Sequence, residues 1–239
     1  MDKNNIVNAL MKGVITVDGQ FLSGSNYTFR GNLTHESEEF QVVYKPVRGE
    51  QPLWDFAAGS LAHREAAAYL LSEGLGWDLV PPTVYRRKAP IGPGSIQFYI
   101  EHDPEYHYFN FEEADRLRLR PAVLFDLLAN NADRKAGHVL RGEDGHLWLI
   151  DQGLCFHVDD KLRTVLWDFG GEPIPAELTA DLERLDGLLE RGGPLREDLE
   201  GHLRSGEVSA LAARARGLLD AGCFPMPPAS RRSYPWPPV

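Results

Sequence analysis

Cysteine is scarce in this sequence, and a long apolar run is absent. Cys155 and Cys223 are the only cysteines among 239 residues, and they form no CxxC pattern. This gives no sign of a disulfide framework or a zinc site and suits a reducing compartment. The first residues, MDKNNIVNALMKG, lack an apolar core of signal-peptide length, and no later window approaches the length that spans a bilayer. We therefore expect a cytoplasmic protein without integral membrane association.

Positive charge is also in short supply. The sequence has 25 Lys and Arg against 35 Asp and Glu, a formal net charge of -10. Such a balance opposes non-specific attraction to DNA, RNA or anionic lipid, so we expect no nucleic-acid partner. The hydrophobic content of 43% is sufficient for a core in one large domain or two small lobes.

The first hundred residues show a β-rich pattern with one helix. Short apolar runs separated by Gly, Ser and Asn predict an antiparallel meander, and a later Ala- and Leu-rich run predicts a helix capped by Ser60 and stopped by Gly74 and Gly76. The predicted strands cover residues 13–22, 26–33, 40–46, 81–88 and 95–101, and the predicted helix covers residues 61–76. This pattern favours a five-stranded sheet that carries a single helix.

The rest of the chain is predicted to be mainly helical. The non-periodic segment HDPEYHYFN reads as a connector, which divides the chain into lobes at residues 1–103 and 104–239. The overall fold class is therefore α+β. Helices are predicted at 111–120, 121–131, 176–192 and 205–222, with a hairpin formed by 138–142 and 146–153. The Pro-rich tail, residues 223–239, is predicted to be extended, with a role as a proline-recognition ligand the less favoured interpretation.

Two acidic loops flank the predicted hairpin. Asp133 lies in the polar loop NNADRKAGHVL, and Asp151 ends the apolar strand LWLID, where Gly153 would let the chain turn sharply. Phosphoryl transfer needs one carboxylate near the acceptor hydroxyl and another group that holds a metal on the nucleotide phosphates. These loops could supply both. The structural alternative is that Asp133 caps a turn while Asp151 pairs with Arg134.

Two weaker signals precede these loops. The stretch SGSNYTF is a tight turn whose backbone N–H groups could face phosphate oxygens, although taken alone it is better explained as a hairpin turn without a ligand. Lys45 ends an apolar strand, and Glu65 in the next helix could orient its ammonium. Taken singly, these two residues would be an ordinary surface Lys and a solvated Glu.

The motifs together resemble a known family. The stretch EAAAYLLSEGLGWDLVPPTV, the NADR loop and IDQGLCF are similar to phosphatidylinositol 3/4-kinase-type proteins, especially type II phosphatidylinositol 4-kinases and their bacterial relatives. The layout also resembles HipA-type protein kinases. The resemblance runs from about Gly13 to Phe156 in the family's order of motifs, and ordered matches are far harder to obtain by chance than one motif. It implies a two-lobed atypical kinase fold, with a β-rich N-lobe and a mainly helical C-lobe, that binds ATP with Mg²⁺ or Mn²⁺.

The resemblance also implies roles for particular residues. Asp133 would be the catalytic aspartate, and Asp151 would bind the metal. Lys45 would contact the phosphates, positioned by Glu65. The remaining nucleotide contacts would come from the phosphate turn, from the end of the fifth strand at the adenine and from one side chain on the base: Ser23, Gly24, Ser25 and Asn26; Tyr99, Ile100 and Glu101; and Val43.

One position departs from the family's pattern. Five residues after the catalytic aspartate the family usually carries an Asn that binds a second metal, whereas this chain has His138. An imidazole nitrogen favours manganese, iron or zinc more than magnesium, which prefers oxygen. Three outcomes stay open: a manganese-preferring kinase, a one-metal enzyme, and a protein that binds nucleotide without transfer. His138 could equally be a satisfied structural residue.

These observations predict an ATP-dependent phosphotransferase. A lipid acceptor is disfavoured because the acidic chain shows no polybasic patch, which leaves a protein side chain or a small soluble alcohol. The resemblance implies that the loop RGEQPLWDFAAG lies beside the cleft, where its aromatics could form an acceptor or partner surface, although core packing is the commoner fate of such residues. The alternatives are a nucleotide-binding pseudokinase that acts through a partner, and a metal-binding protein that uses Asp133, His138 and Asp151 without nucleotide.

Overall fold

An antiparallel sheet of five strands organises the first half of the chain in the computed structural model, which describes residues 2–21 and 26–239. Buried and more exposed residues alternate along residues 29–35 and 38–46, so one face of the sheet can be buried by a helix. The strands lie in the order β1-β2-β3-β5-β4 and comprise β1 (Val14–Gln20), β2 (Phe29–His35), β3 (Glu38–Pro46), β4 (Thr83–Arg86) and β5 (Gly94–Phe98). The predicted five-stranded sheet is thus confirmed.

A helix that the sequence pattern did not predict covers one face of this sheet. Helix α1 (Lys3–Lys12) buries Leu10 against a cluster that includes Leu33, Tyr44 and Ile96. Its sequence, KNNIVNALMK, is short and contains three Asn, which are weak helix formers, and no side-chain hydrogen bond caps its start. The local signals for a helix are therefore weak, and packing on the sheet selects the conformation.

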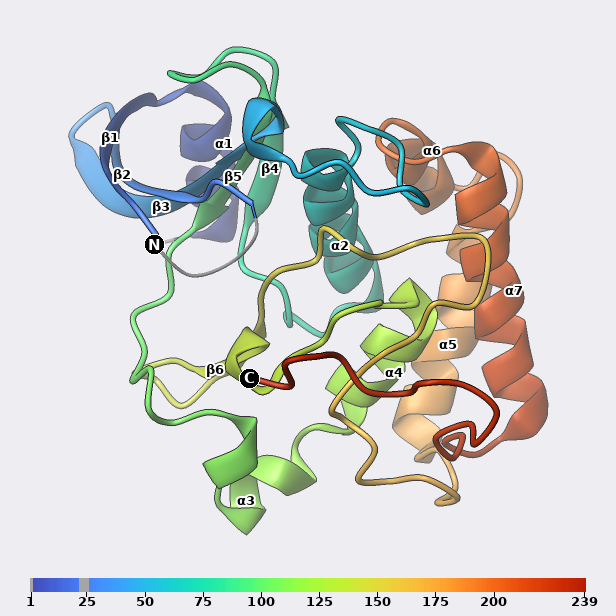
Figure 1. Ribbon diagram of the computed structural model, residues 1–239. Coiled ribbons are helices and arrows are strands. Elements are labelled where there is room, and N and C mark those ends of the chain that lie inside the picture. The colour runs from blue at the N-terminus through green and yellow to red at the C-terminus, as the bar shows by residue number, and fades with distance from the viewer. Residues whose placement is uncertain (1, 22–25) are drawn as a thin grey trace.

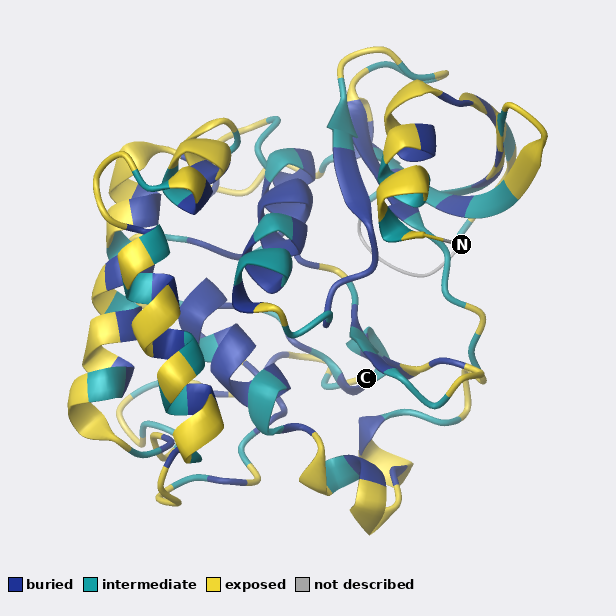
Figure 2. Cartoon of the chain, turned by 180° about the vertical axis from the view of Figure 1, so that it is seen from behind, coloured by how far each residue is buried: buried dark blue, intermediate teal, exposed yellow. Residues whose placement is uncertain are grey.

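Helix α2 (Leu61–Leu75) stands between the sheet and the helical half (Figure 1). Eleven of its fifteen residues are buried, and the ribbon seen from behind is dark blue along most of the helix (Figure 2). It contacts β4 and β5 on one side and helices α5 and α6 on the other. Because α2 is buried on nearly all sides, it connects the sheet firmly to the helical half.

The start and end of α2 differ from the prediction. Ser60 makes no capping bond, because the Glu50 carboxylate already accepts from the N–H groups of Gly59 (2.9 Å) and Ala62 (3.1 Å). Gly76 ends the helix in a left-handed conformation (φ 71°). Gly74 does not stop it; a Cβ at this position would lie 2.6 Å from Leu195 Cδ2, so Gly74 allows close packing instead.

The second half is mainly helical, as predicted. The helices are α3 (Glu113–Leu117), α4 (Arg120–Ala129), α5 (Ala176–Leu188), α6 (Pro194–Glu200) and α7 (Ser205–Ala221), and the hairpin is β6 (Val139–Arg141) with β7 (Leu147–Leu149). Short 3-10 turns occupy Val47–Gly49, Tyr108–Asn110 and Ala136–His138. Helix α6 was not predicted, since seven residues are too few for a clear period. The predicted helix at 111–120 is shorter in the structure. Only Glu113–Leu117 form α3, and Arg120 already belongs to α4.

The tail, residues 223–239, is extended and ordered against the second half. In Figure 1 it runs in red in front of helices α4 and α5 and ends near β6. Its hydrogen bonds reach Glu172, Thr164 and Ala136. Across the described residues, no helix combines the length and the apolar character that a membrane crossing requires.

Candidate functional site

Three charged side chains from separate elements meet where the sheet faces the helical half. The Lys45 ammonium at the end of β3 donates to Glu65 Oε1 of α2 and to Asp151 Oδ1 (2.9 Å), which follows β7. Burial alone would lower the pKa of Lys45, but the Asp151 and Glu65 carboxylates outweigh this effect and raise it. Lys45 is therefore a fixed cation between these two carboxylates.

Asp151 is accessible within this cluster. Its side chain is 49% exposed, whereas that of Glu65 is 3% exposed. The Lys45 ammonium lowers the pKa of Asp151 despite the opposing effect of burial, so the carboxylate is ionised over the whole physiological range. Asp151 thus exposes charged oxygens that a ligand can reach, while Glu65 serves mainly to hold Lys45.

The backbone at Asp151 adopts a left-handed conformation, with φ at 59°. This conformation costs a residue with a side chain on the order of 1 kcal/mol or more, and such outliers cluster at functional sites. It aims the next N–H, from Gln152, at Glu65 Oε2 (3.0 Å). The sharp turn that the sequence suggested at Gly153 therefore lies at Asp151. Gly153 instead packs close to helix α2, where a Cβ would lie 3.4 Å from Leu61 Cβ.

A buried ion pair supports the loop that carries Asp133. The Arg134 guanidinium donates to both carboxylate oxygens of Asp126 on α4 at 2.9–3.1 Å, and both side chains are fully buried. It also donates to the Ile150 carbonyl (2.7 Å) and to Gln152 Oε1 (2.8 Å). Arg134 thus pairs with Asp126 rather than with Asp151. Sequence reasoning missed Asp126, whose only signal was an acidic residue inside an apolar helix.

Asp133 itself lies beside this network with its side chain partly exposed. Its N–H donates to Asn131 Oδ1 (2.9 Å), and its carboxylate lies 3.5 Å from Lys135 Nζ. Burial raises the pKa of Asp133 above its ordinary value, and the nearby Asp151 adds to the shift while Lys135 opposes it. The carboxylate therefore has the character of a proton acceptor slightly stronger than a free Asp.

His138 lies next to Asp151 rather than on the surface. Its Nε2 is 3.4 Å from Asp151 Oδ2. Burial lowers the pKa of His138 to about 4, even though Asp151 opposes the shift. The imidazole is thus neutral at physiological pH. Its Nδ1 accepts from the Lys135 N–H (3.4 Å), so the ring proton is on Nε2 and faces Asp151, and a metal could bind Nε2 only after displacing this proton.

These donors fit a metal that is held partly by a nucleotide. Asp151 and His138 face each other, but within residues 2–21 and 26–239 no three His, Cys, Asp or Glu side chains gather as a metal group. A metal held on phosphates needs only one or two protein ligands, because phosphate oxygens and water complete its shell. The arrangement suits that case and gives no support to a self-contained metal site that includes Asp133.

Of the residues expected around the adenine, Val43 lies within β3, and Tyr99, Ile100 and Glu101 directly follow β5. Val43 is on the same face of β3 as Lys45, two residues away, and is partly exposed. The Tyr99 N–H donates to the Gln41 carbonyl (3.0 Å), so this donor is already used inside the sheet. Ile100 follows, and the Glu101 carboxylate lies 3.7 Å from Arg30.

Of the four residues expected in the phosphate turn, the structure describes only Asn26. Ser23, Gly24 and Ser25 lie outside the described residues. Asn26 Oδ1 accepts from the Gln51 N–H (2.7 Å), which ties the end of the turn to the segment after β3.

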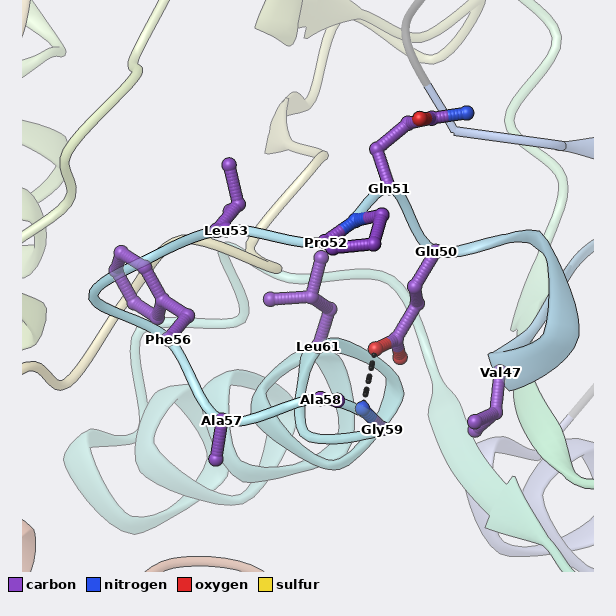
Figure 3. A pocket seen from close by; sticks show the side chains of 10 residues that line it. All are labelled: Val47, Glu50, Gln51, Pro52, Leu53, Phe56, Ala57, Ala58, Gly59 and Leu61. Atoms are coloured by element: carbon purple, nitrogen blue, oxygen red, sulfur yellow. Dashed lines mark hydrogen bonds between the residues drawn. The ribbon is translucent and has the colours of Figure 1, made fainter.

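A cavity of about 170 Å³ is lined by none of the three residues of the charged cluster (Figure 3). Its walls come from residues 47–61, including Glu50, Phe56 and Leu61. Phe56 and Leu61 pack with Ala132, the neighbour of Asp133. The loop of residues 50–59 is therefore beside the Asp133 loop. Trp54 on this loop is 91% exposed, and the Lys161 ammonium lies 4.7 Å from its ring centre.

Comparison with solved structures defines the class of fold. The chain is similar to hydra Fam20 in a structure with sugar, with a TM-score of 0.61 and 16% identity over 91% of this chain and 87% of that one. It is also similar to the Helicobacter pylori proinflammatory kinase CtkA, with a TM-score of 0.55 and 10% identity over 90% and 94% of the two chains. The protein has the two-lobed atypical kinase fold, which confirms the predicted fold class.

Comparison of sequences identifies the family. The chain is 41% identical over 264 aligned positions to Protein Rv2133c of Mycobacterium tuberculosis, covering 95% of this chain and 93% of that protein. It belongs to the same family as Protein Rv2133c. It is also 29% identical over 149 positions to phosphatidylinositol 4-kinase gamma 4 of Oryza sativa subsp. japonica, which covers 54% of this chain and 26% of the plant protein. No protein-family model matches the sequence.

Proposed function

We propose that this protein is an ATP-dependent phosphotransferase. The observation that carries the proposal is the Lys45 ammonium held between Glu65 and Asp151, with Asp133 on the neighbouring loop. Phosphoryl transfer consists mainly of positioning and charge neutralisation, and these residues provide a fixed cation, an accessible carboxylate and a proton acceptor. The atypical kinase fold of the structural neighbours is consistent with this chemistry.

Each residue has a definite task in the proposed reaction. The Lys45 ammonium neutralises phosphate charge, and Glu65 keeps it in place. Asp133 accepts the proton of the acceptor hydroxyl while the hydroxyl oxygen bonds to the γ-phosphorus and the bond from phosphorus to the ADP oxygen breaks. Asp151, with His138, would hold a Mg²⁺ or Mn²⁺ ion, whose chemistry is to neutralise charge on the phosphate oxygens.

Two variants separate nucleotide binding from transfer. ATP with a divalent metal at about 100 times the dissociation constant should stabilise the wild type by about 2.7 kcal/mol, which corresponds to a rise in Tm of roughly 5–10 °C. Asp151→Asn should lose the metal-dependent part of this rise. Asp133→Asn should keep the rise and lose turnover of labelled ATP, because it removes only the proton acceptor.

The control is Asp159→Asn, which changes an exposed carboxylate outside the cluster and should behave as wild type. The measurements are run with Mg²⁺ and separately with Mn²⁺, since the His138 nitrogen favours manganese. An unchanged Tm with every combination of nucleotide and metal would contradict the proposal.

A second candidate function is supported by His138. A buried, neutral imidazole stands where an oxygen ligand of a second metal is expected from the family resemblance, and this could leave nucleotide binding intact while preventing transfer. In this case the same experiment gives a nucleotide-dependent rise in Tm without turnover in either metal.

For the acceptor, we propose a hydroxyl on a protein side chain or a small soluble alcohol. The loop of residues 50–59 supports this proposal, because its Phe56 packs with Ala132 next to Asp133 and the same loop carries the exposed Trp54 ring. Exposed Trp side chains are common anchors at binding surfaces. The net charge of -10 disfavours an acceptor embedded in an anionic membrane.

A further inference from the structure

The Asp133 loop contacts residues 163–165, which lie about thirty residues later in the sequence. Arg134 and Thr164 form an isolated parallel bridge, in which the Arg134 N–H donates to the Arg163 carbonyl (3.0 Å) and the Val165 N–H donates to the Arg134 carbonyl (3.1 Å). The position of the Asp133 loop thus depends on residues 163–165.

The C-terminal tail forms backbone hydrogen bonds with both the Asp133 loop and residues 163–165. The Thr164 N–H donates to the Ser233 carbonyl (3.0 Å), and the Ala136 N–H donates to the Pro238 carbonyl (2.8 Å). Trp167 Nε1 donates to the same Ser233 carbonyl (3.3 Å). We call residues 231–238 the strap. Its backbone bonds to positions on both sides of the Arg134 bridge, and in Figure 1 it ends near β6, next to the Asp133 loop.

Side chains fix the strap at its start. The Arg231 guanidinium donates to the Leu162 carbonyl and to Asp160 Oδ1 (2.6 Å). The Ser233 hydroxyl donates to the Pro228 carbonyl (2.9 Å), and both Ser233 and Pro235 are buried. An extended segment with these anchors and several fixed prolines loses little conformational freedom when it docks.

We propose that the strap is a positioning element for Asp133. It holds residues 134–136 and 162–167 together, so that the Asp133 carboxylate is kept where the acceptor hydroxyl is deprotonated. The inference rests on the proposed phosphotransferase function. The nucleotide side of the cleft is built separately, by Lys45 on β3 and Glu65 on α2. Loosening the strap should therefore reduce the rate of transfer without weakening ATP binding.

The test uses the full chain with ATP and Mn²⁺. Arg231→Ala removes the side-chain anchor, and deletion of residues 234–239 removes the bond from Ala136 to Pro238. Both changes should lower kcat for ATP turnover at least tenfold while KM for ATP stays within twofold of wild type. Arg231→Lys should recover part of kcat, because one of the two contacts can be remade.

The matched control is Arg216→Ala on α7. Arg216 forms a comparable ion pair with Asp186 (2.8 Å) away from the Asp133 loop, so kcat should be unchanged. Hydrogen exchange at the Ala136 amide provides a second readout and should be at least tenfold faster in the deletion variant than in wild type.

The outcomes are distinguishable. If the wild type turns over ATP and both strap variants keep its kcat, the positioning role is wrong. A fall in kcat together with an equal loss of ATP affinity and Tm would also overturn it, since this is general destabilisation. If the wild type shows no turnover, the phosphotransferase function fails instead, and unchanged exchange at Ala136 would then overturn the structural role of the strap.

Discussion

Arg134 is a fully buried charge one residue away from Asp133, so its partners decide how firmly the loop is held. Its guanidinium is shared among Asp126, the Ile150 carbonyl and Gln152. The Thr164 hydroxyl also donates to Asp126 (2.9 Å). One ion pair therefore connects helix α4, the Asp133 loop, the Asp151 loop and the segment beneath the strap.

Removing only the cation should be costly. Arg134→Met leaves the Asp126 carboxylate buried without its main partner, and breaking a buried pair in this way costs about 3–5 kcal/mol. Urea unfolding monitored by circular dichroism should show this loss. Replacing both residues, Arg134→Met with Asp126→Leu, should recover much of the stability, because no uncompensated charge is left.

The matched control is Arg163→Ala, an exposed arginine whose replacement should change the free energy of unfolding by no more than about 0.5 kcal/mol. Equal losses for the Arg134 and Arg163 variants would contradict the importance of the buried pair.

Sequence reasoning at the scale of residues identified side chains better than their geometry. Lys45, Glu65 and Asp151 were singled out by their order along the chain, and the structure brings them together. The left-handed turn at Asp151 was not foreseen, since a neighbouring glycine was available for it. The Asp126 partner of Arg134 could not be predicted either, because pairing across a fold depends on tertiary packing rather than on local pattern.

At the scale of elements, helix α2 is held by close packing as well as by its ion pairs. Gly74 faces Leu195 of α6, and a Cβ placed on it would approach Leu195 Cδ2 to 2.6 Å. Gly217 on α7 is also inside a helix, but a Cβ there meets nothing within 4 Å. Substitution of Gly217 therefore tests helix propensity alone, whereas substitution of Gly74 tests helix propensity together with packing.

We expect opposite signs for the two substitutions. Gly217→Ala should stabilise the protein by roughly 0.5–1 kcal/mol, because Ala is the better helix former. Gly74→Ala should destabilise it by about 1–2 kcal/mol, because overpacking outweighs the same gain. Chemical denaturation measures both changes. A stabilising Gly74→Ala would show that α6 can move away from α2 at little cost.

Elements with a strong local period were predicted, and those without one were not. The strands of the sheet, the hairpin and helices α4, α5 and α7 follow apolar periods and turn residues. Helix α1 has a weak start signal, and α6 has only seven residues. The order in the tail was also unpredictable, because a Pro-rich segment has no period and takes its place from distant backbone partners.

At the scale of the whole molecule, a histidine pair joins the two lobes. His63 of α2 stacks on Tyr85 of β4, with ring centres 3.7 Å apart, and its Nδ1 is 3.2 Å from Nδ1 of His202, between α6 and α7. Burial lowers the pKa of both imidazoles; Arg87 adds to the effect at His63, and Asp198 opposes it at His202. Because the two Nδ1 atoms are only 3.2 Å apart, a proton on both at once would be disfavoured by repulsion.

The pair should make stability depend on pH. Because the folded-state pKa of each imidazole is below the ordinary value of about 6.5, the unfolded chain binds more protons as the pH falls through that value. The free energy of unfolding should therefore decrease between pH 7.5 and pH 5.5. Tm measured across this range should fall less steeply for the double variant His63→Asn with His202→Asn, and identical slopes would contradict the assignment.

The buried arginine of helix α2 has a consequence for how the protein could be controlled. Arg64 donates to Glu207 of α7 and to the Cys155 carbonyl, and its side chain is 5% exposed. Moving α2 away from the helical lobe would break this pair, at a cost of up to about 3–5 kcal/mol if either charge stays buried without its partner. At about 1.4 kcal/mol per factor of ten, a conformer with α2 displaced would be populated by roughly one molecule in a hundred to one in several thousand. Regulation by an outward movement of helix α2, which carries Glu65, would therefore require an effector that contributes this free energy.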